Sequence, residues 1–348
     1  MKRITTLQLA LSFVGVFLGA GFVSGQELWQ FFACFGPAGL LGFLLSAGLF
    51  LLVDLALLQL SRKTGITSIG SLVLPGDHPV LCRIIDFLQC LLLLGVLVIM
   101  IAGAASLLHD LTGLSTVFCG LLFTLILLPV ALLDLQGLVA SFSVLVPITC
   151  TAAVIMGVTI LIRQDFRFAP AAGSVSALMP NWWISGVTYA AYNLFGTIAV
   201  LVPFASLVPD QKTIRRGLGL GTLFLLVLTF CILASLIAIP EAGSTELPTA
   251  TLAAQLHPLL GIVYNLLMGL GMFAAALSSI IAFLNQGGLH WNSLQTHRRK
   301  WLLIVCLAAW LLSLAGFGNL IGIIYPIFGY ISIPLLAMLV RNWLKSLR

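Results

Sequence analysis

Apolar stretches of about 20 residues, the length of a membrane-spanning helix, recur from one end of this 348-residue chain to the other. Only 7% of the residues are charged, whereas a soluble domain carries about 25%. In lipid, backbone polar groups must find partners within the protein, and the stretches lack the alternating pattern of barrel strands. The sequence therefore predicts an all-α integral membrane protein.

Polar connections divide the chain into ten expected membrane-spanning segments. Their approximate bounds are 7–34, 37–61, 80–108, 114–133, 138–162, 182–208, 216–240, 252–288, 301–315 and 317–340. Because no linker or low-complexity segment separates a soluble part, we expect one transmembrane domain covering residues 1–348.

The basic residues indicate the orientation of these segments. Ten spans place both termini on one side of the membrane, and 14 of the 16 Lys and Arg residues then fall on that side. Only Arg163 and Arg167 lie opposite. Cytoplasmic loops collect Lys and Arg, so both termini are expected in the cytoplasm. The net charge of +6 is thus an orientation signal, and we do not expect nucleic-acid binding.

The spans fall into two sets of five, in residues of approximately 1–162 and 182–348. With an odd number of spans in each set, the second set enters the membrane from the side opposite to the first. This arrangement is typical of an inverted-topology repeat.

The stretch "GAGFVSGQE" interrupts the first span with three glycines, Gly19, Gly21 and Gly25. Each glycine weakens a helix by about 1 kcal/mol relative to alanine, so the stretch favours a break in the helix. A second interpretation stays open, because Gly21 and Gly25 also have the spacing at which small residues pack two membrane helices together.

Ser24 and Glu27 have the spacing of a capping box, which marks the start of a helix. The first span is therefore expected to be helical from about residue 4 to residue 18, unwound over 19–23 and helical again over 25–34. Non-helical backbone at membrane depth is tolerated only where protein or a water-filled cavity surrounds it. The break therefore predicts a binding site.

The sixth span carries a comparable group of residues in "YAAYNLFGT". Tyr189, Tyr192, Asn193 and Gly196 lie near its middle, and Asn193 could cap a restarted helix. Interrupted helices at matching positions of two repeats point to a binding site at the membrane midplane. The alternative is an unbroken helix with an aromatic packing face that tolerates one asparagine.

On the eighth span, Ala275, Ser278 and Ser279 share one helix face. Two hydroxyls and a carbonyl on one face suit a hard cation such as sodium. Alternatively, the serines bond back to carbonyls one turn earlier and only allow close packing. No His, Cys or acidic cluster has the spacing of metal ligands, and no cofactor is expected apart from sodium as a coupling ion.

Two acidic residues lie within predicted spans, Glu27 in the first and Asp54 in the second. Ionisable residues inside a membrane are costly and are usually functional or paired. Either residue could therefore carry a proton, although Glu27 could also act only as the capping residue described above.

The motifs "GAGFVSGQE" and "YAAYN" resemble those of the YkvI family of bacterial membrane proteins, within the amino acid–polyamine–organocation superfamily. The resemblance covers essentially the whole chain. It implies the LeuT fold, with ten helices in a five-plus-five inverted repeat and broken helices 1 and 6. It also implies a multi-pass protein of the bacterial inner membrane.

The resemblance further implies an alternating-access secondary transporter whose substrate lies between spans 1 and 6. The substrate-binding residues would be Gly19, Ala20, Gly21, Phe22, Ser24, Gly25, Tyr189, Tyr192, Asn193 and Phe195. The backbone amides among them would hold a carboxylate, because helix N-termini carry free N–H groups and the positive end of the dipole. A sodium ion would lie between the carbonyls of Gly15 and Leu18 and the face of Ala275, Ser278 and Ser279.

These observations together predict a cation-coupled importer of an amino acid or a related small carboxylate, with sodium as the favoured coupling ion. Two alternatives stay open: proton coupling through Glu27 or Asp54, and a sensor on the same fold that binds a small molecule without transporting it. An enzyme is not expected, because the sequence shows no set of nucleophile and base and no catalytic metal set.

Overall fold

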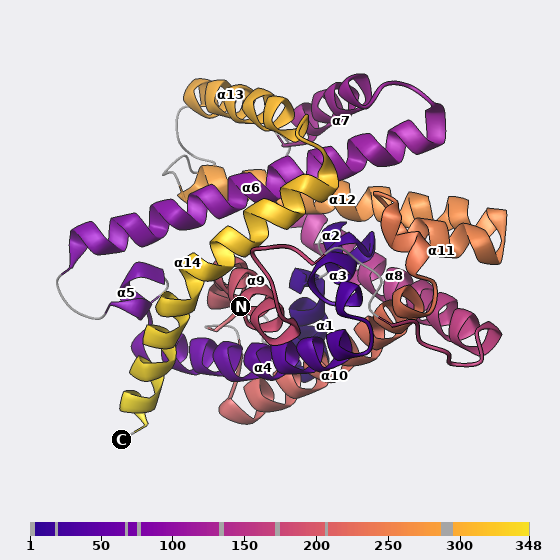
Figure 1. Ribbon diagram of the computed structural model, residues 1–348. Coiled ribbons are helices and arrows are strands. Elements are labelled where there is room, and N and C mark those ends of the chain that lie inside the picture. The colour runs from indigo at the N-terminus through magenta and orange to yellow at the C-terminus, as the bar shows by residue number, and fades with distance from the viewer. Residues whose placement is uncertain are drawn as a thin grey trace.

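Helices form nearly all of the regular structure in the computed structural model, and no strand occurs among the residues that it describes (Figure 1). These residues are 4–17, 20–66, 69–74, 78–131, 136–170, 175–205, 208–286 and 295–347. The α-helices are α1 (Thr6–Phe17), α2 (Ala20–Val23), α3 (Gln26–Phe31), α4 (Ala38–Thr64), α5 (Ile69–Val73), α6 (Pro79–Thr112), α7 (Thr116–Ala131), α8 (Gln136–Arg163), α9 (Trp182–Phe204), α10 (Gln211–Ala238), α11 (Pro248–Leu256), α12 (Pro258–Gln286), α13 (Gln295–Ser313) and α14 (Phe317–Ser346). Two short 3₁₀ helices are η1 (Ala33–Phe35) and η2 (Pro240–Ser244).

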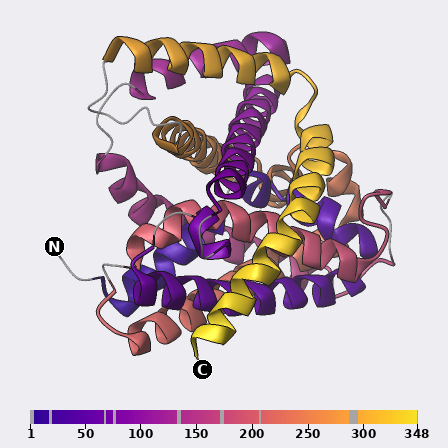
Figure 2. The same ribbon diagram turned by 90° about the vertical axis from the view of Figure 1, so that its left-hand side faces the viewer.

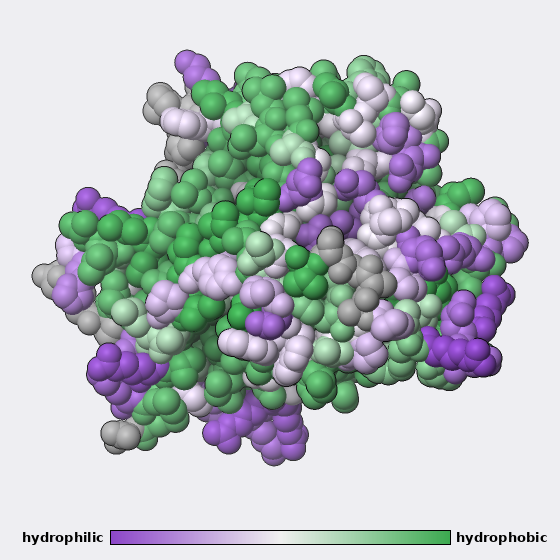
Figure 3. Space-filling model, in the orientation of Figure 1, coloured by the Kyte–Doolittle hydropathy of each residue, from purple (hydrophilic) through white to green (hydrophobic). Residues whose placement is uncertain are grey.

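Five of these helices, α4, α6, α10, α12 and α14, are long and apolar enough to cross a membrane within the residues that the structure describes. Three shorter apolar stretches occur in α1, α7 and α8. The chain is therefore a multi-pass membrane protein, and the count of ten spans stays a prediction. Hydrophobic residues cover much of the face shown in Figure 3, and hydrophilic residues gather in separate groups near its edges.

The predicted eighth span, 252–288, is divided into two helices. α11 ends at Leu256, His257 has an extended backbone, and α12 begins at Pro258. A proline lacks the N–H that a helix interior needs and disfavours helical geometry in the preceding residue. The prediction was therefore wrong at its N-terminal end, because residues 252–256 belong to a separate short helix.

The helices pack in two connected groups. α9 packs along both α4 and α14, while α10 packs against α1, α4 and α8. α6 pairs with α12 and α7, and α13 lies on α6 and α7 at the periphery of the molecule (Figures 1 and 2). The first span lies among α9, α10, α11 and α14, so the interrupted stretch is enclosed by protein.

Small residues bring α1 close to α10. A Cβ atom on Gly217 would lie 2.7 Å from the side chain of Leu9, and one on Gly221 would lie 2.7 Å from the ring of Phe13. Close approach at small residues is how membrane helices gain packing energy, since lipid gives them little hydrophobic driving force. The first half of span 1 is thus held by apolar packing.

Candidate functional site

The first span is interrupted at Ser24 and Gly25. Gly25 has a φ of +79°, a left-handed conformation that glycine adopts without a Cβ penalty. The N–H of Gly25 donates to the carbonyl of Phe22, and the carbonyl of Gly25 accepts from Trp29 in α3. The chain therefore turns at this point and begins a new helix.

The position of the interruption differs from the predicted one. Residues 20–23, expected to be unwound, form the helical turn α2, whereas Leu18 and Gly19 lie outside the described residues. Ala20 and Gly21, predicted to bind a substrate carboxylate through their amides, lie in this turn. The unwound part of the described chain is the pair that follows α2.

Backbone groups freed by the interruption find partners in α11 and α12. The hydroxyl of Thr249 donates to the carbonyl of Val23 at 2.6 Å, and its N–H donates to the carbonyl of Ser24 at 2.9 Å. Tyr264 Oη also donates to Val23, at 3.2 Å. Buried carbonyls need such partners, so the first turn of α11 replaces the missing helical hydrogen bonds.

The capping-box prediction is only partly matched. Ser24 Oγ accepts from the N–H of Gln26 at 3.3 Å, so the serine does bond the start of α3. Glu27 does not bond back toward Ser24; its Oε2 instead accepts from the hydroxyl of Tyr192 at 2.7 Å. A role for Glu27 as a capping residue is therefore wrong in this structure.

Glu27 lies at the centre of a cluster of three tyrosines. Its side chain is only 4% exposed, and Tyr189 and Tyr325 lie beside the same carboxyl group. The rings of Tyr192 and Tyr325 stack with centroids 4.2 Å apart and planes 9° from parallel. Three helices, α3, α9 and α14, thus meet at one buried acid.

Other aromatic side chains pack around this acid. The ring centroid of Phe31 lies 5.2 Å from that of Tyr189 and 5.7 Å from that of Tyr192. Phe22 and Phe195 are both fully buried, and the carbonyl of Phe195 accepts from Gln89 Nε2 at 3.3 Å. Tyr189 and Tyr192 contact each other within this aromatic group, and their role in binding a substrate stays a prediction.

The predicted break in the sixth span is wrong, because α9 is continuous from Trp182 to Phe204. Asn193 Nδ2 donates to the carbonyl of Tyr189 at 3.0 Å, one turn earlier, and does not cap a new helix. Thr197 Oγ1 likewise donates to the carbonyl of Leu194 at 2.9 Å. Asn193 and Thr197 thus bond to carbonyls of their own helix, and the backbone of α9 stays helical around them.

Asp54 borders α9 at a different point from Glu27. It is fully buried in α4, and its Oδ1 accepts from Thr197 Oγ1 at 3.4 Å. Its Oδ2 has no hydrogen-bond partner within the described part of the chain. Thr197 follows Tyr192 by five residues, about 7 Å along a helix axis. The two buried acids therefore contact α9 at separate levels.

The predicted sodium ligands have unequal surroundings. On α12, Ser279 is 7% exposed, Ala275 is half-buried and Ser278 is exposed. Gly15 lies in α1 and is half-buried, and Leu18 falls in the gap after α1. No cluster of three or more His, Cys, Asp or Glu residues that could hold a metal occurs in the described ranges.

Polar contacts fasten α3 to the helices around it. Gln30 Nε2 donates to the carbonyl of Gly318 in α14 at 2.9 Å, and the N–H of Gly318 donates to Glu246 Oε2 at 3.0 Å. Ser185 Oγ, in α9, donates to the carbonyl of Phe31 at 2.5 Å. The second half of span 1 is thus closed against α9 and α14.

Sequence reasoning missed several residues of this site: Gln30, Glu246, Thr249, Tyr264 and Tyr325. Tyr325 had a usable signal, since it is a tyrosine in the middle of an apolar span and directly precedes Pro326. Thr249 had none, because it meets Val23 across 226 residues of sequence.

Comparison with known proteins gives relatives along nearly the whole chain. The chain is 29% identical to the uncharacterized membrane protein YkvI of Bacillus subtilis (strain 168), covering 95% of this chain and 94% of YkvI. It is 21% identical to the uncharacterized protein YyaD of the same strain, covering 94% of each. The resemblance to YkvI is therefore confirmed, while no family model matches the chain.

Several solved structures resemble the chain in fold but are much less similar in sequence. MhsT in complex with L-phenylalanine has a TM-score of 0.62 at 15% identity, over 97% of this chain and 87% of MhsT. A Na⁺-coupled sialic acid symporter has a TM-score of 0.62 at 16% identity, over 98% of this chain and 79% of the symporter. The manganese transporter of Eremococcus coleocola has a TM-score of 0.60 at 13% identity, over 98% of this chain and 85% of the transporter. These similarities show that the chain has the LeuT fold.

Proposed function

We propose that the protein is a secondary transporter that imports an amino acid or a related small carboxylate by alternating access, with a cation as the coupling species. The observation that carries this proposal is the interruption at Ser24 and Gly25, with Glu27 buried directly beyond it. Separated helix ends and a buried acid at membrane depth are costly, and such features mark sites for solutes and ions.

The substrate class follows from the chemistry of the interruption. The amides of Ala20 and Gly21, which precede the interruption at Ser24 and Gly25, are the groups proposed to hold a substrate carboxylate. Two of the structural neighbours are named with L-phenylalanine and sialic acid, and both molecules carry a carboxylate group.

Glu27 supports an amino acid over a simple carboxylate. An amino acid also carries an ammonium group, which needs an acceptor when it leaves water. Glu27 accepts one hydrogen bond from Tyr192, and a carboxylate has further lone pairs for an ammonium. In this proposal Tyr189, Tyr192, Asn193 and Phe195 form the opposite wall, on α9.

Sodium is the favoured coupling ion, bound by carbonyls of Gly15 and Leu18 together with Ala275, Ser278 and Ser279. A Na⁺-coupled symporter among the structural neighbours supports this choice. Proton coupling through Asp54 is the second candidate, because one oxygen of this buried acid has no partner in the described residues.

The arrangement of helix pairs supports an inverted repeat of residues 1–162 and 182–348. A repeat of five spans maps the second span onto the seventh and the sixth onto the first. It therefore relates the pair α4–α9 to the pair α10–α1, and both pairs pack extensively. Two related bundles that move against each other would give alternating access to a central site.

Uptake by the purified protein in liposomes tests this function. We expect counterflow of labelled amino acids that increases with an inward sodium gradient. A sensor would instead bind the ligand, seen as a higher unfolding temperature, without any counterflow. A response to a proton gradient alone would favour Asp54 or Glu27 over sodium.

A substitution in the predicted sodium site tests the coupling ion. We expect Ser279→Ala to abolish sodium-dependent uptake, because it removes a buried oxygen ligand, while leaving membrane insertion intact. Thr159→Val is a matched control, since the Thr159 hydroxyl only bonds back to Ile155 within α8 and the side chain is half-buried. Unchanged sodium dependence in Ser279→Ala would reject the assignment.

A further inference from the structure

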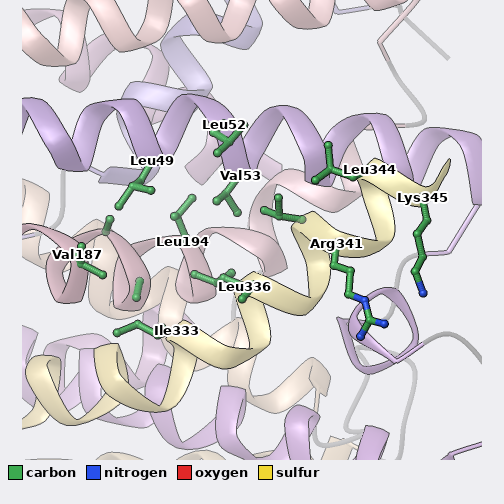
Figure 4. A pocket seen from close by; sticks show the side chains of 14 residues that line it. Leu49, Leu52, Val53, Val187, Leu194, Ile333, Leu336, Arg341, Leu344 and Lys345 are labelled. Carbon is green, nitrogen blue, oxygen red and sulfur yellow. The ribbon is translucent and has the colours of Figure 1, made fainter. Parts of the chain in front are cut away.

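An apolar groove of about 600 Å³ lies outside the site described above, between α4, α9 and α14 (Figure 4). The α9 residues that line it include Val187, Ala190 and Leu194. With 100° between successive residues of a helix, these face away from Tyr189 and Tyr192. The groove and the buried acid Glu27 are therefore on opposite sides of one helix.

The lining of the groove is chemically divided. Every lining residue is aliphatic except Arg341 and Lys345, which lie one helical turn apart on α14. Figure 4 shows these two side chains together at one end, with the aliphatic side chains of α4, α9 and α14 along the rest. Such a groove matches a molecule with an anionic head and a long apolar tail.

The two cations are available to a ligand. Arg341 and Lys345 are both exposed, and neither makes an ion pair or hydrogen bond within the described residues. Neighbouring basic side chains differ, because Arg62 donates to the carbonyl of Pro209 and Lys63 to that of Ser346. The groove therefore ends at positive charge that the protein does not neutralise itself.

We propose that this groove binds an anionic glycerophospholipid, with an acyl chain along Val53, Leu194 and Leu336 and the phosphate on Arg341 and Lys345. Both cations belong to the side on which the basic residues of the chain collect, which is the cytoplasmic side. The lipid would therefore come from the cytoplasmic leaflet, whose anionic lipids attract Lys and Arg near the membrane surface. This proposal does not depend on the transported solute.

Native mass spectrometry of the full chain in detergent tests the proposal, with phosphatidylglycerol and phosphatidylcholine added at equal concentration. We expect the wild type to retain phosphatidylglycerol in preference to phosphatidylcholine. Arg341→Gln with Lys345→Gln should weaken phosphatidylglycerol binding by about fivefold for each charge removed. Binding of phosphatidylcholine should be unaffected.

Two further variants separate the head from the tail. Arg215→Gln with Arg216→Gln removes two exposed cations from α10, away from the groove, and should leave the preference unchanged. Ala337→Trp fills the groove from its exposed edge and should lower the retention of both lipids while both cations remain.

Four results would overturn the proposal. Equal retention of the two lipids by the wild type would show that the cations select nothing. If the variant with Arg215→Gln and Arg216→Gln lost as much phosphatidylglycerol as the variant with Arg341→Gln and Lys345→Gln, the cations would act only through net charge. If Ala337→Trp retained both lipids fully, the acyl chain would lie elsewhere. A second copy of the chain in the groove would appear as a dimer peak and would equally exclude the lipid.

Discussion

The first span and α9 carry similar residues and yet fold differently. Both place glycines and polar side chains at mid-span, but the first span is interrupted at Gly25 whereas α9 continues through Asn193. At the interruption, donors from α11 and α12 satisfy the freed carbonyls. In α9, Asn193 and Thr197 bond to carbonyls of their own helix. Glycine permits a break, and donors from another element stabilise it.

The largest effect is expected when a side chain is added at the turn of the interrupted span. Gly25→Ala forces a left-handed conformation on an L-residue, at about 1–2 kcal/mol, and places a Cβ 2.7 Å from the Thr249 side chain. We expect the free energy of unfolding to fall by about 3 kcal/mol in total, measured by thermal unfolding in detergent.

Gly48→Ala is the matched control for this change, since Gly48 lies in α4 and a Cβ added there would meet nothing within 4 Å. It should leave stability unchanged or raise it by up to about 1 kcal/mol. If both alanine variants unfold alike, the turn at Gly25 imposes no special requirement and the contrast with α9 is lost.

The next effect concerns the acid that follows the interruption. Glu27→Gln removes the charge that Tyr192 bonds to, and hydrogen bonds to charged groups are worth about 1.5–3 kcal/mol. We expect initial uptake in liposomes to fall by about 10- to 100-fold. Glu241→Gln makes the same chemical change at an exposed position of η2 and should transport normally. If Glu27→Gln takes up substrate at the wild-type rate, Glu27 does not take part in transport.

The smallest effect is expected when one hydroxyl is removed, either beside the interruption or in the continuous helix α9. Thr249→Val removes the donor to Val23 at the interruption and should destabilise the protein by about 1 kcal/mol or more. Thr188→Val removes a hydroxyl that bonds back within α9 to Ile184, whose carbonyl keeps its helical partner. It should therefore change the unfolding temperature much less. Equal shifts would mean that the freed carbonyl does not depend on α11.

The helical architecture was predictable because lipid imposes a simple rule on the sequence. Long apolar stretches must be helices, and α4, α6, α10 and α14 lie close to their predicted bounds. The division of span 8 was missed, although Pro258 was visible, because the hydropathy pattern continues across it. Local chemistry, here a proline, overrode the pattern at that point.

The candidate site was less predictable because its contacts join distant parts of the chain. Glycine content located the interruption to within a few residues, but the turn lies at Gly25, where a left-handed conformation and Thr249 coincide. The sequence named Tyr189 and Tyr192 as residues of a substrate site but not their contact with Glu27, and Tyr325 follows Tyr192 by 133 residues. No local pattern shows which side chain will supply a donor across the fold.

Thr249 also connects the two halves of the chain. It is bonded to both Val23 and Ser24, and its helix is joined to α12 through the single residue His257. These bonds and the short connection tie the interruption in the first span to α11 and, through His257, to α12, the helix that carries the predicted sodium ligand Ser279.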